Sequence, residues 1–248
     1  MIELKTPGEL ELMRQAGRIV AGMLARLSDL VRPGIKTKAL DQAAAAYLDE
    51  AGAAPAFLRY RGYPATICVS VNEEVVHGIP GERELLEGDL VSLDVGAVVQ
   101  NWYADAAVTV PVGAISAEAR RLTETTRRAL QQGIAQAIVG NRLSDISHAV
   151  QQVAEREGFG IVREFVGHGI GRALHEDPPI PNFGPPNTGP RLRAGMVLAI
   201  EPMVTLGHQD VYVLADGWTA VTKDRSLAAH FEHTVAVTER GPEVLTQP

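Results

Sequence analysis

The chain has 248 residues, 46% hydrophobic and 21% charged, and a formal net charge of −7, a balance that excludes collagen, a coiled coil and a disordered chain. The acidic charge argues against nucleic acid as a partner, and no apolar run approaches the ~18 residues that cross a bilayer, so no membrane partner is expected. With no secretory signal at its start and one cysteine, Cys68, the protein is expected to be cytoplasmic.

The first half of the chain predicts two helices followed by three strands. Thr6 and Glu9 have the spacing of a capping box, so a helix is expected from Thr6 until Arg32-Pro33-Gly34 ends it. A second helix is expected over 37–50, with Gly52 as its C-terminal stop. Strands are expected over 67–71, 90–99 and 102–110, with Gln100-Asn101 as the hairpin turn between the last two.

The second half repeats this order. Ser116 is expected to open a helix that reaches about Ile138, and Ser144 another that ends near Gly158. Strands are expected over 161–166, 196–206, 211–214 and 231–238. Two helices followed by strands, twice over, indicate a duplicated α/β unit around one core. We therefore expect a single domain over residues 1–248.

Four acidic residues interrupt segments that otherwise resemble buried strands: Asp94, Asp105, Glu201 and Glu232. A buried carboxylate is unfavourable unless it is paired or protonated. Residues 84–119 and 194–222 contain no Lys or Arg, so a divalent cation is the more economical counter-charge. Asp94 and Asp105 flank the predicted turn, where a hairpin can place both side chains on one face. The alternative for either residue alone is an ordinary aspartate at a strand end.

Histidines supply candidate nitrogen ligands. His168 and His175 lie among glycines and prolines in FVGHGIGRALHEDPP, and His77 lies in VNEEVVHGIP. The alternative for each is a surface or structural role. Four ionised carboxylates would be neutralised by two divalent metals, and a pair of metals ~3.5–4 Å apart can activate water and polarise a carbonyl. The pattern predicts hydrolysis of an amide or ester without a nucleophilic serine or cysteine.

The remaining histidines are assigned by their position. His230 and His233 flank Glu232, but strand alternation sends His233 to the opposite face, so His233 is expected to be structural. The role of His230 stays open. No catalytic role is expected for His148 and His208.

Five stretches in this order resemble the type I methionine aminopeptidases, a family of pita-bread metallopeptidases: ICVSVNEEVVHGIP, LDVGAVVQNWYADAAVT, FVGHGIGRALHEDP, LAIEPM and DGWTAVTKDRSLAAHFEHTVAVT. The resemblance covers nearly the whole chain. It implies the pita-bread fold, an α/β (α+β) structure whose pseudo-twofold antiparallel sheet core is covered by two pairs of helices. It also implies removal of the initiator methionine from nascent chains with a small second residue, by attack of a hydroxide that bridges two metals.

The resemblance also implies a role for each matching residue. Asp94 would be the terminal ligand of one metal, His168 and Glu201 would be terminal ligands of the other, and Asp105 and Glu232 would bridge them. Glu201 also resembles the general base, His175 the residue that hydrogen-bonds the scissile carbonyl, and His77 the residue at the substrate amide nitrogen. The pocket for the methionine side chain would be lined by Tyr60, Tyr63, Cys68, Leu174 and Trp218.

This sequence departs from the family pattern at two positions near that pocket. Leu174 stands where many relatives have an aromatic residue, and Phe57 where some have cysteine. The expected cofactors are two divalent ions per chain, of Co, Mn, Fe(II) or Zn, since oxygen-rich ligation with one imidazole suits all four. The expected partners are nascent N-termini, with transient ribosome association, and the expected state is a monomer. The alternatives are an X-Pro aminopeptidase or prolidase-like enzyme and a non-catalytic pita-bread interaction protein.

Overall fold

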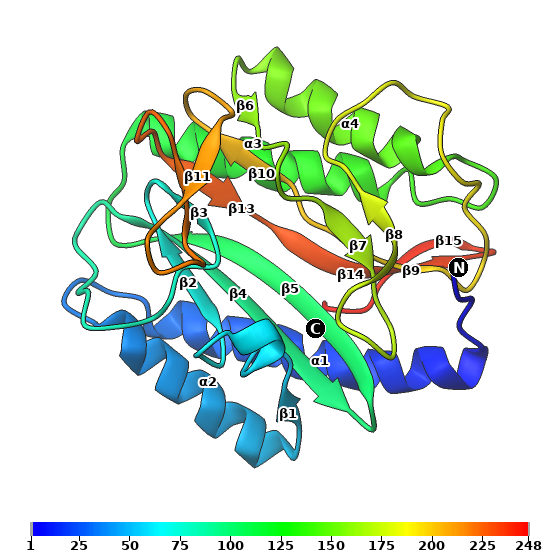
Figure 1. Cartoon of the computed structure of the whole chain (residues 1–248), viewed down its shortest axis with the longest axis horizontal. Coiled ribbons are helices and arrows are strands. Elements are labelled where there is room, and N and C mark those ends of the chain that lie inside the picture. The colour runs from blue at the N-terminus through cyan, green and yellow to red at the C-terminus, as the bar shows by residue number, and fades with distance from the viewer. Residues whose placement is uncertain (1, 248) are drawn as a thin grey trace.

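The computed structural model describes residues 2–247. It contains two pairs of helices, one below and one above the strands in the view of Figure 1. The helices are α1 (Pro7–Leu30), α2 (Thr37–Ala51), α3 (Ala117–Ile134) and α4 (Leu143–Arg156), with a short 3-10 helix, η1 (Tyr60–Gly62). The expected α/β structure, with an antiparallel sheet core covered by two helix pairs, is confirmed.

The strands of the first half are β1 (Ala54–Pro55), β2 (Cys68–Val71), β3 (Glu74–Val76), β4 (Leu90–Val99) and β5 (Trp102–Pro111). Those of the second half are β6 (Gly160–Ile161), β7 (Gly167–Gly169), β8 (Glu176–Ile180), β9 (Val197–Ile200), β10 (Met203–Thr205), β11 (Val211–Val213), β12 (Ala220–Thr222), β13 (Ala228–His230), β14 (Glu232–Thr238) and β15 (Gly241–Val244).

A nine-stranded sheet forms the centre of the molecule. Its order is β1-β4-β5-β14-β9-β7-β8, with β2 paired to β4 and β15 paired to β14. Two three-stranded sheets, β13-β10-β6 and β11-β12-β3, complete the described strands, and all of these pairings are antiparallel. Because β5 pairs with β14, the two halves of the chain meet at the middle of the sheet.

The helix cap, the helix stop and the hairpin turn predicted for the first half of the chain are all present. The Thr6 hydroxyl accepts a hydrogen bond from the Glu9 backbone N–H at 3.4 Å, and the Glu9 carboxylate accepts one from the Thr6 N–H at 2.9 Å. Gly52, with φ 65°, ends α2 in the left-handed conformation that glycine adopts without strain. Gln100 and Asn101 have φ values of 49° and 64°, as a two-residue hairpin turn requires.

The helices of the second half differ from expectation at one end each. Helix α3 ends at Ile134 instead of Ile138, because the chain tightens into short-range bonds such as Ala137 N–H to the Ile134 carbonyl at 2.9 Å. Helix α4 begins at Leu143 because the Arg142 N–H donates to the Asp145 carboxylate at 2.8 Å. Ser144 is not the cap, since its hydroxyl donates to the Thr188 carbonyl.

Two strand predictions were wrong in their extent. The segment 161–166 is extended only at its start, since β6 ends at Ile161 and β7 begins at Gly167. The segment 196–206 is two strands, β9 and β10, in different sheets. The break falls at Glu201-Pro202, where proline has no N–H to donate to a ladder.

The core lies between the helices and one face of the sheet. Leu93 and Val95 are fully buried in a cluster with Val20 and Met23 of α1. Since side chains alternate along a strand, Asp94 between them projects from the opposite face. Packing against α1 therefore fixes which face of β4 carries the acidic residue.

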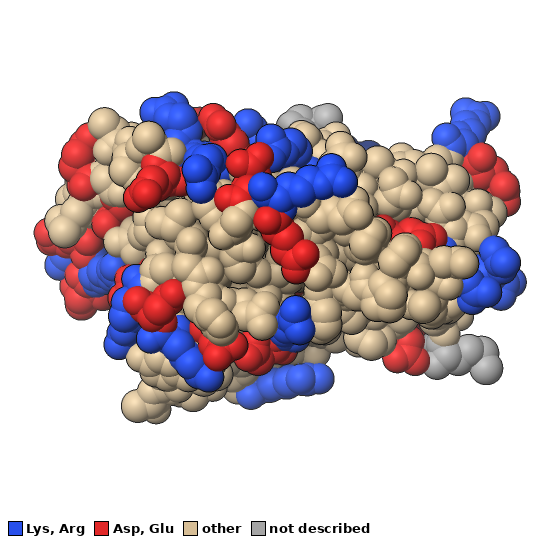
Figure 2. Space-filling model, turned by 90° about the horizontal axis from the view of Figure 1, so that it is seen from above, with Lys and Arg blue, Asp and Glu red and all other residues tan. Residues whose placement is uncertain are grey.

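Within residues 2–247, no helix has the length and apolar character that a membrane crossing requires. On the face seen in Figure 2, acidic and basic side chains are interspersed rather than gathered into one basic surface.

Candidate metal centre

The register of the central sheet places three of the predicted carboxylates on one face. Ala107 of β5 is the Cα partner of Asp94 on β4 and of Glu232 on β14. Asp105 lies two residues before Ala107, so its side chain projects from the same face. Three acidic residues that are up to 138 positions apart in the sequence thus meet over the middle strand.

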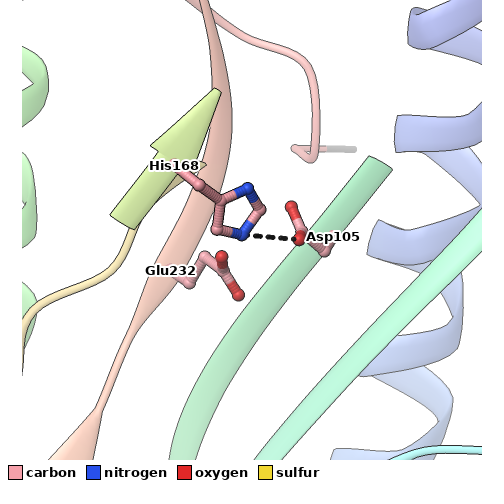
Figure 3. A group of neighbouring side chains, drawn as sticks. All are labelled: Asp105, His168 and Glu232. Carbon is pink, nitrogen blue, oxygen red and sulfur yellow. Dashed lines mark ion pairs between the residues drawn. The ribbon is translucent and has the colours of Figure 1, made fainter. Parts of the chain in front are cut away.

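His168 lies on β7, and Glu201 directly follows the neighbouring strand β9. His168 pairs with Ala199, and Glu201 lies two residues beyond Ala199, at the break before Pro202. The His168 Nε2 atom lies 3.4 Å from Asp105 Oδ2 and 3.6 Å from Glu201 Oε1. Figure 3 shows Asp105, His168 and Glu232 pointing toward one another.

This arrangement fits a divalent metal. One donor atom from each of Asp105, His168 and Glu232 lies within 4.8 Å of the others, and all three residues are buried. Asp94 Oδ1 is buried without a hydrogen-bond partner, as expected of an oxygen that would bind a cation. A set of carboxylate oxygens with one imidazole nitrogen suits a first-row divalent metal.

Burial gives the acidic groups a high affinity for protons. It raises the pKa of Asp94 and of Asp105 to about 7, and that of Glu201 to about 8. It also raises the pKa of Glu232, and the nearby Asp105 carboxylate adds to this effect. The buried site therefore favours either a proton or a cation on these oxygens, so metal binding would be coupled to proton release.

Two neighbouring groups orient the donors. The His168 Nδ1 atom lies 2.9 Å from the Gly169 carbonyl, to which it donates, so the Nε2 lone pair is left facing Asp105. The Asp105 backbone N–H donates to the Thr234 hydroxyl at 3.1 Å, and this hydroxyl lies 3.0 Å from Asp105 Oδ1. Both contacts restrict the donor side chains before any metal binds.

The donors open into a cavity of about 170 Å³. All twelve of the residues proposed from the sequence line it: Tyr60, Tyr63, Cys68, His77, Asp94, Asp105, His168, Leu174, His175, Glu201, Trp218 and Glu232. Phe57, the second departure from the family pattern, also lines it. One wall is therefore acidic, while the other is aromatic and apolar with a sulfur atom.

Two further histidines lie in this cavity in neutral form. Burial lowers the pKa of His175 to about 3 and that of His77 to about 4. Tyr60 stacks on His175, with ring centroids 5.3 Å apart, and its hydroxyl lies 2.9 Å from Nδ1. When Tyr60 donates this hydrogen bond, the imidazole proton resides on Nε2, where it can be donated to a ligand.

His230, whose role the sequence left open, lies beside the donors. Its Nε2 atom is buried without a hydrogen-bond partner, 3.5 Å from Glu201 Oε2. The spacing of His230 and Glu232 was the only sequence signal for this placement. His233 lies apart from the donors as expected, with Nδ1 2.9 Å from the Thr246 hydroxyl.

Sequence reasoning did not single out four other residues of the cavity. Arg61, Val76, Phe165 and Val166 also line it, and Phe165 meets the His77 ring edge to face at 5.3 Å. Phe165 and Val166 lie in the loop between β6 and β7, Arg61 lies in η1 and Val76 ends β3, and none of these short segments has a periodic pattern that marks it in the sequence.

Comparison with known proteins gives the family context. A family model described as Metallopeptidase family M24 matches residues 11–239. The chain is 54% identical over 247 residues to methionine aminopeptidase 1 of Bacillus subtilis, and the match covers 100% of both chains. The solved structure of methionine aminopeptidase from Thermotoga maritima matches it with a TM-score of 0.98 at 48% identity, over 100% of both chains. Prolidase from Pyrococcus furiosus shares the fold, with a TM-score of 0.79 at 22% identity, and this chain covers 65% of it.

Proposed function

The chain belongs to metallopeptidase family M24, and we propose that it removes the N-terminal methionine from proteins and peptides whose second residue is small. One observation carries the proposal. A single cavity has one wall of carboxylates and imidazoles and another wall of aromatic and apolar side chains, which suits the polarisable thioether of methionine. The whole chain of 248 residues acts as one catalytic domain in this proposal.

The proposed ligands are Asp94, Asp105, His168, Glu201 and Glu232, and they would hold two divalent ions. Asp105 and Glu232, which lie on the middle strands of the sheet, would be shared between the ions. Two ions would balance the charge of four carboxylates whose pKa values are raised by burial. Bound divalent ions supply Lewis-acid polarisation of the peptide carbonyl and lower the pKa of water.

Glu201 is proposed to move the proton. In the metal-free site burial raises its pKa to about 8, so its surroundings favour a proton on this carboxyl. It would accept a proton from the attacking water and pass it to the leaving amine. The neighbouring His230 ring, 3.5 Å away, bounds the space that the Glu201 carboxylate can occupy.

His175 and His77 are proposed to bind the scissile amide. The neutral His175 ring, held by Tyr60 at Nδ1, offers Nε2–H to the carbonyl oxygen and to the negative charge that develops there. The neutral His77 ring would contact the amide nitrogen. Phe165 and Trp218 pack against the edges and faces of the His77 ring and limit its rotation.

The methionine side chain is proposed to lie against Tyr63, Cys68, Leu174 and Trp218. Tyr63 is fixed for this role because its hydroxyl donates to backbone carbonyls, including that of Gly78 at 2.9 Å, and its ring meets Trp218 edge to face at 5.1 Å. Leu174 is smaller than an aromatic residue, so this wall leaves more room than in relatives that carry one.

Peptide hydrolysis with controlled metal tests the proposal. After chelation, the protein is supplied with Mn²⁺ or Co²⁺ and assayed with Met-Ala-Ser, Met-Lys-Ser, Leu-Ala-Ser and N-acetyl-Met-Ala-Ser. We expect rapid cleavage of Met-Ala-Ser alone, and none in the presence of chelator. Equal cleavage of Met-Ala-Ser and Met-Lys-Ser, or of neither, would overturn the proposal.

The rival functions predict different outcomes. An X-Pro enzyme would cleave Ala-Pro and Met-Pro peptides in preference to Met-Ala, and the likeness to prolidase at 22% identity supports a shared fold only. A non-catalytic interaction protein would bind no divalent metal in a titration. The convergence of metal donors in one buried cluster favours the metal-dependent enzyme.

The proposal extends to the setting of the reaction. The substrates would be nascent chains emerging from the ribosome in the cytoplasm, met by a monomer that associates with the ribosome transiently. Co-sedimentation with translating ribosomes and analytical ultracentrifugation of the purified protein test these two points separately.

A further inference from the structure

The loop 170–175, between β7 and β8, carries two of the residues proposed to meet the substrate, Leu174 and His175. A loop of this kind needs partners for the backbone groups that pair with no strand, as the amides of Arg172 and Ala173 do here. The partner here is Glu176, the residue directly after His175. Its Oε1 atom accepts hydrogen bonds from the backbone N–H groups of Arg172 at 2.7 Å and Ala173 at 3.2 Å.

The Glu176 carboxylate is itself held by Lys5, which lies before α1 and 171 positions away. The Lys5 ammonium pairs with Glu176 Oε2, and the two side chains are only 3% and 14% exposed. The Lys5 backbone N–H donates to the Gly195 carbonyl at 2.7 Å, so the main chain is also fixed at this point. The pair is thus a buried connection between the N-terminal segment and the loop.

The loop packs closely on this pair. A Cβ atom added to Gly171 would lie 2.4 Å from Lys5 Cε and 2.6 Å from Glu176 Oε1. The Gly171 carbonyl also accepts a hydrogen bond from the Tyr103 N–H at 2.8 Å. Lys5, Gly171 and Glu176 therefore form one compact unit, in which a shift of the ammonium would move the loop backbone.

We propose that the Lys5–Glu176 pair is a positioning device, which sets the loop 170–175 so that His175 Nε2 reaches the substrate carbonyl. The proposal rests on the role of His175 in the proposed function. Lys5 touches neither substrate nor metal and acts through Glu176 and the loop. Loss of Lys5 leaves a buried carboxylate without its counter-charge, and the loop then loses the fixed acceptor of its two amides.

The test compares Lys5→Met with a control in the same segment, Thr6→Ala. Thr6→Ala removes the cap of α1 and so destabilises the N-terminal region, but it leaves the Lys5–Glu176 pair intact. Amide hydrogen exchange is measured for the peptide that contains Arg172 and Ala173, and kcat and KM are measured with Met-Ala-Ser at saturating Mn²⁺. Bound metal is quantified for each variant.

For Lys5→Met we expect faster exchange in this peptide, unchanged bound metal, and a fall in kcat of roughly 10-fold to 100-fold that exceeds any rise in KM. For Thr6→Ala we expect wild-type exchange in this peptide and wild-type kcat. Loop exchange and kcat within twofold of wild type in Lys5→Met would overturn the proposal. Equal losses of kcat in the two variants would also overturn it, since they would indicate general destabilisation.

Glu176→Gln serves where Lys5→Met does not fold. Glutamine keeps an oxygen that can accept the two loop amides but loses the charge that attracts Lys5. We expect faster exchange of the loop amides and a kcat reduced by several-fold. If neither the exchange nor kcat changes, the proposal is overturned. The exchange measurement needs no substrate, so an inactive wild-type protein would refute the proposed function while the loop ordering is still tested.

Discussion

Asp94 and Glu232 are both Cα partners of Ala107, one from each side of β5. This relationship places two carboxylates on a common face although they come from different halves of the chain. Asp105, two residues along β5, completes a row that His168 joins at 3.4 Å from Asp105 Oδ2.

Asp105→Asn should remove most of the metal affinity and lower activity by roughly 10²-fold or more, because an amide carries no charge to balance a cation. At a metal concentration of about 100 times Kd, binding stabilises the wild-type fold by ~2.7 kcal/mol, which is on the order of 5–10 °C in melting temperature. We expect this rise to disappear in the variant. Melting by circular dichroism with and without Mn²⁺ measures it, with Asp210→Asn, a surface carboxylate, as the control. A normal rise in Asp105→Asn would show that Asp105 is not a ligand.

His168→Ala and His175→Ala should separate binding from chemistry. The two rings are close neighbours, with centroids 4.2 Å apart, but only His168 lies against the carboxylates. We expect His168→Ala to lose both metal and activity. We expect His175→Ala to keep its metal and lose about 10²–10³-fold in kcat, the usual effect of removing one donor to a developing oxyanion. Metal analysis after gel filtration, beside peptide kinetics, checks both, and metal loss in His175→Ala would contradict the assignment.

Much of the fold could be predicted from local signals. The capping box of Thr6 and Glu9 and the turn at Gln100-Asn101 are decided by neighbours within a few residues, and both formed as expected. The face of β4 that carries Asp94 could also be predicted, since Leu93 and Val95 must pack on a helix. These features depend on alternation and capping, which a sequence displays directly.

The remaining features depend on contacts that the sequence does not display. Ser144 does not cap α4 because its hydroxyl bonds to the carbonyl of Thr188, in a segment 44 positions away. The pairing of β5 with β14 and the Lys5–Glu176 contact each join distant segments, so only the tertiary structure fixes them. The resemblance named the candidate residues, and the tertiary structure brings them to one cavity.

Cys68 should not be a nucleophile. Its side chain is buried, with 4% of the residue exposed, and burial raises the pKa of its thiol, with a further contribution from the Asp94 carboxylate. We expect iodoacetamide at pH 8 to leave native Cys68 unmodified and activity unchanged, because the thiolate is the reactive form. Intact-mass measurement before and after unfolding in urea checks this, as the unfolded chain should take up one label. Alkylation of the native protein that keeps pace with inactivation would instead indicate a catalytic thiol.

The stability of the metal-free protein should depend on pH through Glu201. Burial raises its pKa from 4.5 to about 8. Between these values the unfolded chain has released the proton while the folded protein still holds it, so unfolding releases a proton and stability falls as pH rises. Glu201→Gln lacks this titration. In EDTA, the urea midpoint of Glu201→Gln relative to that of wild type should therefore be constant below about pH 4.5, increase between about pH 4.5 and 8, and level off above pH 8.

Urea unfolding at several pH values measures this difference in midpoint, with the exposed Glu124→Gln as the control. If the difference in midpoint between Glu201→Gln and wild type does not change with pH, the Glu201 carboxyl has no raised pKa in the folded protein. Its proposed role as the proton carrier would then lose its physical basis.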